Sequence, residues 1–340
     1  MFNSESDSIN GVLRQVKEAA DSARSQEELV KAVDIACQYP GALYPNRTVP
    51  IILIICEALV AAIALLGSDG KPSDKAIIVS MLALTASFIG VAMLIQQSSK
   101  SSDVSYKIAQ LSSYFSNNLA VFDGTSSSNL LDLRNKFRDY RRGSQGELCL
   151  SLAGECYGGI HELTYKLYKL KYYESALDAR NDKAQEKYRY SLIIDFPWVK
   201  NIYVRSGSVG EATYPITWET SSPDFNDKFT LSGYSEIECS KFAKPAPLQH
   251  IALMGTEFKN LNLEFSSDET LCVSLDNDIL QFKDIGITIL ARHLFLSKIK
   301  EGIELPQLQR LLNMTHKLAE YYDDNFEAPS TLSHPQARNE

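Results

Sequence analysis

Five histidines could act as general bases or metal ligands, but none stands at a spacing that such chemistry uses. They are His161, His250, His293, His316 and His334. A zinc protease places two histidines four residues apart with a glutamate beside the first, and a serine hydrolase sets its nucleophile between glycines. Neither pattern occurs in this chain, so we assign no catalytic residue from the sequence.

Cysteine and carboxylate clusters give no stronger indication of a site. The six cysteines are Cys37, Cys56, Cys149, Cys156, Cys239 and Cys272. Cys149 and Cys156 could bind a metal together with His161, but their spacing matches no usual zinc pattern. Residues 276–278 look like a calcium loop without its glycine and closing glutamate, which is typical of a surface turn. We expect free thiols in a reduced compartment, no metal and no cofactor.

An enzyme whose site is assembled from distant residues stays open as an alternative. Glu155, His161, Asp195 and His250 carry groups that can transfer protons. The glycines between residues 143 and 159 do not form a phosphate loop, because no Gly-Lys-Ser or Gly-Lys-Thr follows them. Whether the four proton-transfer groups meet depends on the elements that carry them.

Two apolar blocks dominate those elements, at residues 49–66 and 76–95, and a polar link joins them at residues 67–75. Each block is close to the roughly 20 residues that a membrane-spanning helix needs. Apolar side chains in the first block favour insertion by about 3 to 6 kcal/mol, and Glu57 opposes it by about 2.5 to 3.5 kcal/mol. The sum predicts a transmembrane hairpin over residues 48–96. A buried helical pair in a soluble core is the alternative.

Glu57 is the one acid inside these blocks. A turn at the middle of the link would set it at the depth of Thr85, to which a protonated Glu57 could donate a hydrogen bond. Ala86 and Gly90 have the spacing of small residues that lets helices approach closely. Glu57 therefore either holds the hairpin or an oligomer together, or it lies on a path for protons or ions.

Composition and charge limit the classes of protein. A chain of 340 residues predicts two or three domains, and a net charge of −8 argues against nucleic acid as a partner. Residues 1–47 are polar and show no cleavable signal peptide. Lysines and arginines are more numerous on the outer flanks of the two blocks than in the link between them, which favours both termini in the cytoplasm.

Helices are predicted on both sides of the hairpin. Residues 1–47 form an amphipathic arm, in which residues 6–38 are one helix or two helices with a break near Arg24. Residues 97–142 form a helical stalk with helices at residues 103–120 and 129–142. The last of these carries a basic cluster that either faces anionic lipid or is a solvated face. Its members are Arg134, Arg138, Arg141 and Arg142, together with Lys136.

Residues 143–325 are predicted to form an α+β soluble domain. Tyrosine-rich alternation predicts strands between residues 163 and 172 and from 188 to 196, although a helix over residues 161–180 fits the leucine spacing as well. Further strands are predicted at residues 202–204, 229–231, 237–242, 261–265 and 270–275, and helices at residues 245–254, 286–300 and 306–324. Residues 326–340 are predicted to be a disordered tail. The predicted fold class is α+β, with a two-helix transmembrane hairpin, flanking helices and a C-terminal mixed α+β cytosolic domain.

The segment at residues 218–233 resembles a motif of an uncharacterised bacterial membrane protein family, a domain of unknown function that is often encoded near LemA-type proteins. The residues that carry the match are Pro223, Asp224, Phe225, Phe229 and Gly233. The predicted strand at residues 189–196 is similar to a strand of that family. The resemblance covers about residues 45–325. It implies a two-span protein of the bacterial inner membrane with a cytosolic α+β domain, and it implies no catalytic residues.

From these features we expect an integral membrane scaffold or adaptor that presents its cytosolic α+β domain to a protein partner, with no catalysis evident. Its partners would be the lipid bilayer and either a second copy of the chain or another membrane protein. Two alternatives remain: a membrane-anchored enzyme with a site assembled from distant residues, and an oligomeric transporter that uses Glu57.

Overall fold

The computed structural model describes residues 2–41, 43, 55, 59, 81, 85, 88, 99–158, 161–174, 184–206 and 214–323. The chain divides into two compact units. Unit 1 comprises Met1–Asn117 and Phe282–Glu304, and unit 2 comprises Asn118–Gln281 and Leu305–Glu340. Unit 2 is thus inserted into unit 1, and each unit is described by itself.

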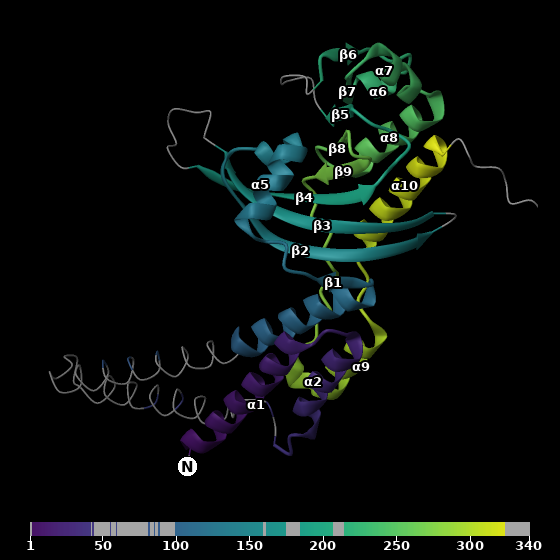
Figure 1. Ribbon diagram of the computed structural model, residues 1–340. Helices are drawn as coiled ribbons and strands as arrows, with labels where there is room; N and C mark the ends of the chain where they lie inside the picture. The colour runs from purple at the N-terminus through teal and green to yellow at the C-terminus, as the bar shows by residue number, and fades with distance from the viewer. Residues whose placement is uncertain are drawn as a thin grey trace, which may run out of the picture. The chain divides into compact units, whose positions relative to one another are not determined.

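Unit 1 is helical. Its elements are α1 (Phe2–Ser22), α2 (Gln26–Gln38), a helix at residues 99–116, a short 3-10 helix η2 (Ile289–Ala291) and α9 (Arg292–Glu301). Figure 1 shows α1, α2 and α9 packed together. Their shared core is apolar and contains Ile9, Leu13, Val16, Leu29, Val33, Ile108, Phe295 and Ile299. The amphipathic pattern of the predicted arm therefore packs against other helices of the same unit.

The break between α1 and α2 follows from capping. Ser25 adopts an extended conformation, and its hydroxyl accepts a hydrogen bond from the backbone N–H of Glu28 at 3.2 Å. A capped start ends the preceding helix and begins a new one. The two-helix alternative is therefore confirmed, with the break at Arg24. The predicted helix at residues 286–300 starts later, because α9 begins at Arg292.

Unit 2 contains a nine-stranded sheet within the described residues (Figure 1). The strands are β1 (Leu119–Val121), β2 (Ser144–Gly158), β3 (His161–Glu174), β4 (Gln185–Asp195), β5 (Ile202–Ser206), β6 (Ile216–Trp218), β7 (Phe229–Gly233), β8 (Asn262–Phe265) and β9 (Thr270–Leu275). Their order is β1-β2-β3-β4-β9-β8-β5-β7-β6, and all neighbours are antiparallel.

Helices pack on both faces of this sheet. They are α5 (Ser127–Lys136), the 3-10 helix η1 (Arg138–Arg141), α6 (Pro223–Asn226), α7 (Glu236–Phe242), α8 (Pro245–Glu257) and α10 (Pro306–Tyr322). Leu130 and Leu133 of α5 pack on Tyr168 and Leu170 of β3. Phe265 of β8 points to the opposite face from its neighbour Glu264, and its ring lies 5.5 Å from that of Phe242 of α7.

The tyrosine-rich strands are confirmed as β3 and β4, and the helix over residues 161–180 is excluded for the described part of that range. β2 was not predicted, because its glycines resemble turn signals. In the structure these glycines allow close packing within the sheet or an unusual backbone conformation next to it. Gly154 pairs with Tyr165 of β3, and a Cβ at Gly154 would lie 2.6 Å from the Tyr165 ring. Gly143, before β2, has φ of +56°, which favours glycine.

The predicted strand at residues 237–242 is wrong, because these residues form α7. Ser235 caps the helix: its hydroxyl accepts from the Glu238 N–H at 3.3 Å and donates to the Glu238 carboxylate at 3.0 Å. This reciprocal capping outweighs the strand preference of Ile237 and Phe242. The hairpin of β8 and β9 and the helices α8 and α10 are confirmed.

The predicted transmembrane hairpin is corrected. Among the described residues, none of the helices combines the length and the apolar character that crossing a bilayer requires. The prediction added hydropathy over two continuous blocks, whereas the structure describes only separate helical positions within them, at Ile55, Leu59, Met81, Thr85 and Phe88. The remainder of residues 48–96, Glu57 included, lies outside the described residues.

Several other predictions depended on that hairpin. The transmembrane part of the fold class and the inner-membrane location with cytoplasmic termini are therefore withdrawn, and only the α+β class is kept. Transport through Glu57 stays a prediction, because Glu57 lies outside the described residues. The predicted tail at residues 326–340 also lies outside the described residues.

Candidate functional site

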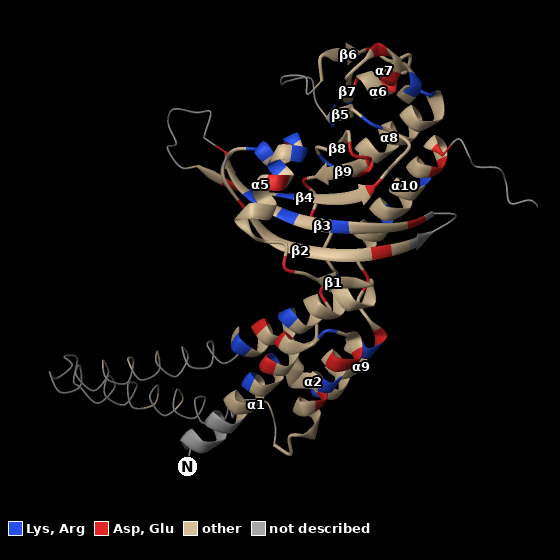
Figure 2. Ribbon diagram, in the orientation of Figure 1, with Lys and Arg blue, Asp and Glu red and all other residues tan. Residues whose placement is uncertain are grey.

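The predicted basic cluster lies on α5 and η1, whose blue side appears in Figure 2. The Arg134 Nε donates to the Tyr140 carbonyl at 3.1 Å, and the Arg141 Nη2 donates to the Asn135 carbonyl at 3.2 Å. The Arg142 guanidinium pairs with Asp139 at 2.7 Å. Three of its arginines thus bind groups of their own segment. A lipid-facing role for the cluster stays a prediction.

A second set of polar side chains lies beneath η1 and is almost completely buried. We call it the Asp139 cluster, formed by Asp139, Arg189, Asn262, Glu264 and Ser274. The side chains of Asp139 and Arg189 are 4% and 2% exposed, and the Arg189 Nη2 lies 2.7 Å from the Asp139 Oδ2. The Asn262 amide donates to the other carboxylate oxygen at 2.9 Å. Both charges of this ion pair are therefore removed from water.

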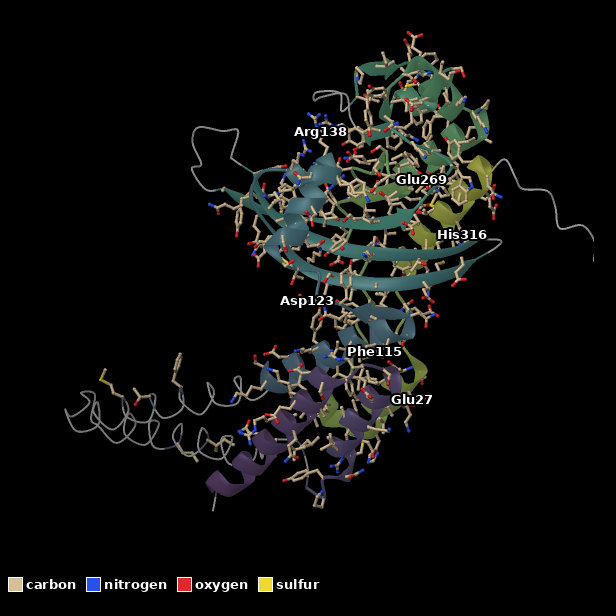
Figure 3. All side chains as sticks on the ribbon, viewed as in Figure 1. Glu27, Phe115, Asp123, Arg138, Glu269 and His316 are labelled. Carbon is tan, nitrogen blue, oxygen red and sulfur yellow. The ribbon has the colours of Figure 1, made fainter. Side chains whose placement is uncertain are left out.

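Strand register explains why these side chains meet. Ser191 of β4 pairs with Ser274 of β9, which pairs with Asn262 of β8. Because alternate residues of a strand share a face, Arg189 and Glu264 lie on that same face, two residues along their strands. The 3-10 helix η1, which begins at Arg138 (labelled in Figure 3), then places Asp139 over them.

The two carboxyls of the cluster have opposite pKa shifts. Burial raises the pKa of Asp139, but the charges of Arg189 and Arg142 and the Ser274 hydroxyl outweigh burial, so that the pKa lies well below its usual range. Burial raises the pKa of Glu264 to about 7. The backbone N–H of Arg138 donates to both Glu264 oxygens, at 3.0 and 2.8 Å, which lowers that pKa only in part. Glu264 therefore holds the first turn of η1.

The charged groups of the Asp139 cluster are all paired within unit 2. Arg189 bridges Asp139 and Asp276, whose Oδ1 lies 2.6 Å from the Arg189 Nη1. Asp139 accepts from Arg189, Arg142, Asn262 and the Ser274 hydroxyl. Removing one partner of such a buried pair costs about 3–5 kcal/mol. This arrangement fastens η1 to the sheet. The sequence contained one signal for it, an arginine between two tyrosines of a strand.

The proton-transfer groups named from the sequence lie on four different elements. Glu155 is on β2, His161 on β3, Asp195 at the end of β4 and His250 on α8. The His250 Nε2 lies 2.7 Å from the Met314 carbonyl, and burial lowers the pKa of His250. Within the described residues, no group of three His, Cys, Asp or Glu side chains is placed to hold a metal ion. The possible calcium loop at residues 276–278 is thus not assembled there, and the possible site at Cys149 is not tested, because it includes the side chain of His161, which lies outside the described side chains.

Large apolar side chains at the described positions of residues 49–95 are exposed. Ile55, Leu59, Met81 and Phe88 are helical and 53%, 57%, 65% and 79% exposed. The Thr85 hydroxyl donates to the Met81 carbonyl at 3.1 Å, one turn back along its own helix. Of the predicted hairpin contacts, Glu57, Ala86 and Gly90 lie outside the described residues. We call the four exposed side chains the apolar helix positions.

Comparison of the chain with protein-family models, with curated proteins and with solved structures finds no match. The resemblance to the two-span bacterial family stays a prediction. Its motif residues have packing roles in unit 2: Pro223 begins α6, and the rings of Phe225 and Phe229 lie 5.4 Å apart. A Cβ at Gly233 would overlap the sulfur of Cys239. These residues of the motif therefore contribute to the packing of unit 2.

Proposed function

We propose that the protein is a scaffold that self-assembles through unit 1 and carries unit 2 as its recognition domain. The observation that carries this proposal is the exposure of the apolar helix positions. Each is more than half exposed. Apolar surface in water costs about 25 cal/mol per Å² relative to a buried contact. Ile55 and Leu59 are both helical and four residues apart, which is the spacing of one helix face. Exposed apolar residues that share a face are typical of an interaction site.

A second copy of the chain is the partner that fits these positions best. Glu57 is the one charged residue in the two apolar blocks at residues 49–66 and 76–95. Permanent contacts between identical subunits are the most apolar class of protein interface. In a two-fold dimer the same surface meets itself, so one apolar surface covers the other without a second binding protein.

A smaller exposed apolar pair supports a recognition role for unit 2. Tyr234 and Ile237 are each 67% exposed and lie three residues apart where α7 begins. A tyrosine provides apolar area together with a hydroxyl, which is why tyrosines are enriched at protein interfaces.

Self-assembly is tested by one matched pair of variants. Leu59→Glu places a charge in the apolar helix positions, and Leu131→Glu places the same charge on α5 of unit 2. Both leucines are helical and 57% exposed. We expect light scattering in aqueous buffer to give an oligomer for the wild type and Leu131→Glu, and a Kd for self-association at least roughly tenfold weaker for Leu59→Glu.

A wild type that stays monomeric at every concentration would contradict self-assembly. Equal weakening by both glutamates would also contradict it, because the contact would then not involve the apolar helix positions.

A further inference from the structure

A cleft of about 420 Å³ lies in unit 1 between α1 and the helix at residues 99–116. Each helix lines it with four residues at the spacing i, i+3, i+4 and i+7, which is one face of a helix. The lining residues are Asn10, Leu13, Arg14, Lys17, Lys100, Asp103, Val104 and Lys107. The cleft is therefore built from two helix faces of regular structure.

The two faces divide this cleft into an apolar base and a charged rim. Leu13 and Val104, one from each helix, are 4% and 8% exposed. The other side chains of the lining include four cations and a single carboxylate, that of Asp103. In a chain with a net charge of −8, this is a local reversal of sign, and the basic residues of both helices appear blue in Figure 2.

Part of this positive charge is not neutralised within the protein. Lys107 pairs with Asp21. Arg14 lies 3.8 Å from Glu18, and both side chains are at least 70% exposed, so that this pair contributes little. Neither Lys17 nor Lys100 has an ion-pair partner among the described residues. One lysine from each helix is thus available to an anion in the cleft.

We propose that this cleft binds a phosphate group, carried by a phosphorylated small molecule or by the headgroup of an anionic lipid. Lysines bind phosphate as point charges, and Arg14 can donate two parallel hydrogen bonds to phosphate oxygens. The volume lies within the range of small-ligand sites. Leu13 and Val104 would contact the apolar part of the ligand. This binding is independent of self-assembly.

The experiment uses the full chain and two probes. Inorganic pyrophosphate is titrated by calorimetry, and vesicles of phosphatidylcholine with or without phosphatidic acid are tested by co-sedimentation. Lys17→Gln and Lys100→Gln should each weaken binding roughly fivefold, and the double variant roughly thirtyfold. The matched control is Lys31→Gln/Lys300→Gln, which removes two exposed lysines of unit 1 outside the cleft and should bind as the wild type does.

A gain of binding provides a test that misfolding cannot imitate. Asp103→Asn removes the one carboxylate among the described residues that line the cleft, and it should tighten binding about two- to fivefold. Binding of pyrophosphate alone supports a small-molecule ligand, and binding of phosphatidic acid vesicles alone supports a lipid headgroup. Polyglutamate, an acidic polymer without phosphate, serves as a further control and should not bind. Binding of neither probe, equal binding of polyglutamate, or unchanged binding in the double lysine variant would overturn the proposal.

Discussion

Two carboxyls of the Asp139 cluster respond to pH in opposite ways. The lowered pKa of Asp139 stabilises the folded protein above the usual value of 3.8, and this contribution is lost as the pH falls through the folded-state pKa. Glu264 has the reverse shift, from 4.5 to about 7. Between pH 4.5 and about pH 7, Glu264 is protonated in the folded protein and ionised in the unfolded chain. The free energy of unfolding therefore falls as the pH rises through this window.

Replacement of Glu264 by glutamine should remove this fall. A glutamine keeps an oxygen that can accept the Arg138 N–H, but it does not titrate. We expect the wild type to lose on the order of 3 kcal/mol relative to Glu264→Gln between pH 5 and pH 8. Unfolding in urea, followed by tryptophan fluorescence at both pH values, measures the difference.

His250, whose pKa is lowered by burial, changes the stability in the opposite direction in both proteins. Only the difference in unfolding free energy between the wild type and Glu264→Gln is therefore informative. Identical pH profiles would contradict the assignment.

At the scale of elements, sequence patterns predicted most strands and helices of unit 2 but not their partners. Tyrosine-rich alternation predicted β3 and β4, and in β3 exposed and buried side chains alternate from Glu162 to Leu167. β2 was missed because its glycines resemble turn signals. The reason for Gly154 is the ring of Tyr165 on β3, which leaves no room for a Cβ, and the sequence does not show that β3 pairs with this segment. The Asp139 cluster was missed for the same reason: Asp139 and Arg189 are 50 residues apart in the chain.

Capping decides the start of α7, so its loss should be measurable. Ser235→Ala leaves the Glu238 N–H without its side-chain acceptor, and we expect a loss of about 1 kcal/mol in the unfolding free energy of unit 2. Ser240→Ala, at an exposed position of the same helix, is the matched control and should be neutral or slightly stabilising. Urea titration compares the three proteins. Equal stability of both variants would show that capping is not what holds this segment helical.

At the scale of the whole molecule, the two compact units should unfold as separate transitions. The chain has two tryptophans, Trp198 and Trp218, and both belong to unit 2. Fluorescence therefore reports on unit 2, whereas far-UV circular dichroism also reports on the helices of unit 1. The two probes agree only when unfolding is all-or-none.

A buried-charge variant provides the test. We expect Asp139→Asn to destabilise unit 2 by about 3–5 kcal/mol, because Arg189 loses a buried partner. Its fluorescence transition should move to lower urea, while one component of the circular dichroism signal stays in place. Asp132→Asn, on the exposed side of α5, should leave both signals unchanged. Coincident transitions in all three proteins would show that the units unfold together.

The insertion of unit 2 into unit 1 has a consequence for synthesis on the ribosome. The helices α1 and α2 and the helix at residues 99–116 emerge first, but Phe295 and Ile299, which share their core, emerge only after every described strand of unit 2. At about 5–20 residues per second, the nascent helices wait on the order of ten seconds or more. During that time the part of their core that Phe295 and Ile299 fill stays open, and a chaperone that shields this apolar surface would increase the amount of protein that folds correctly.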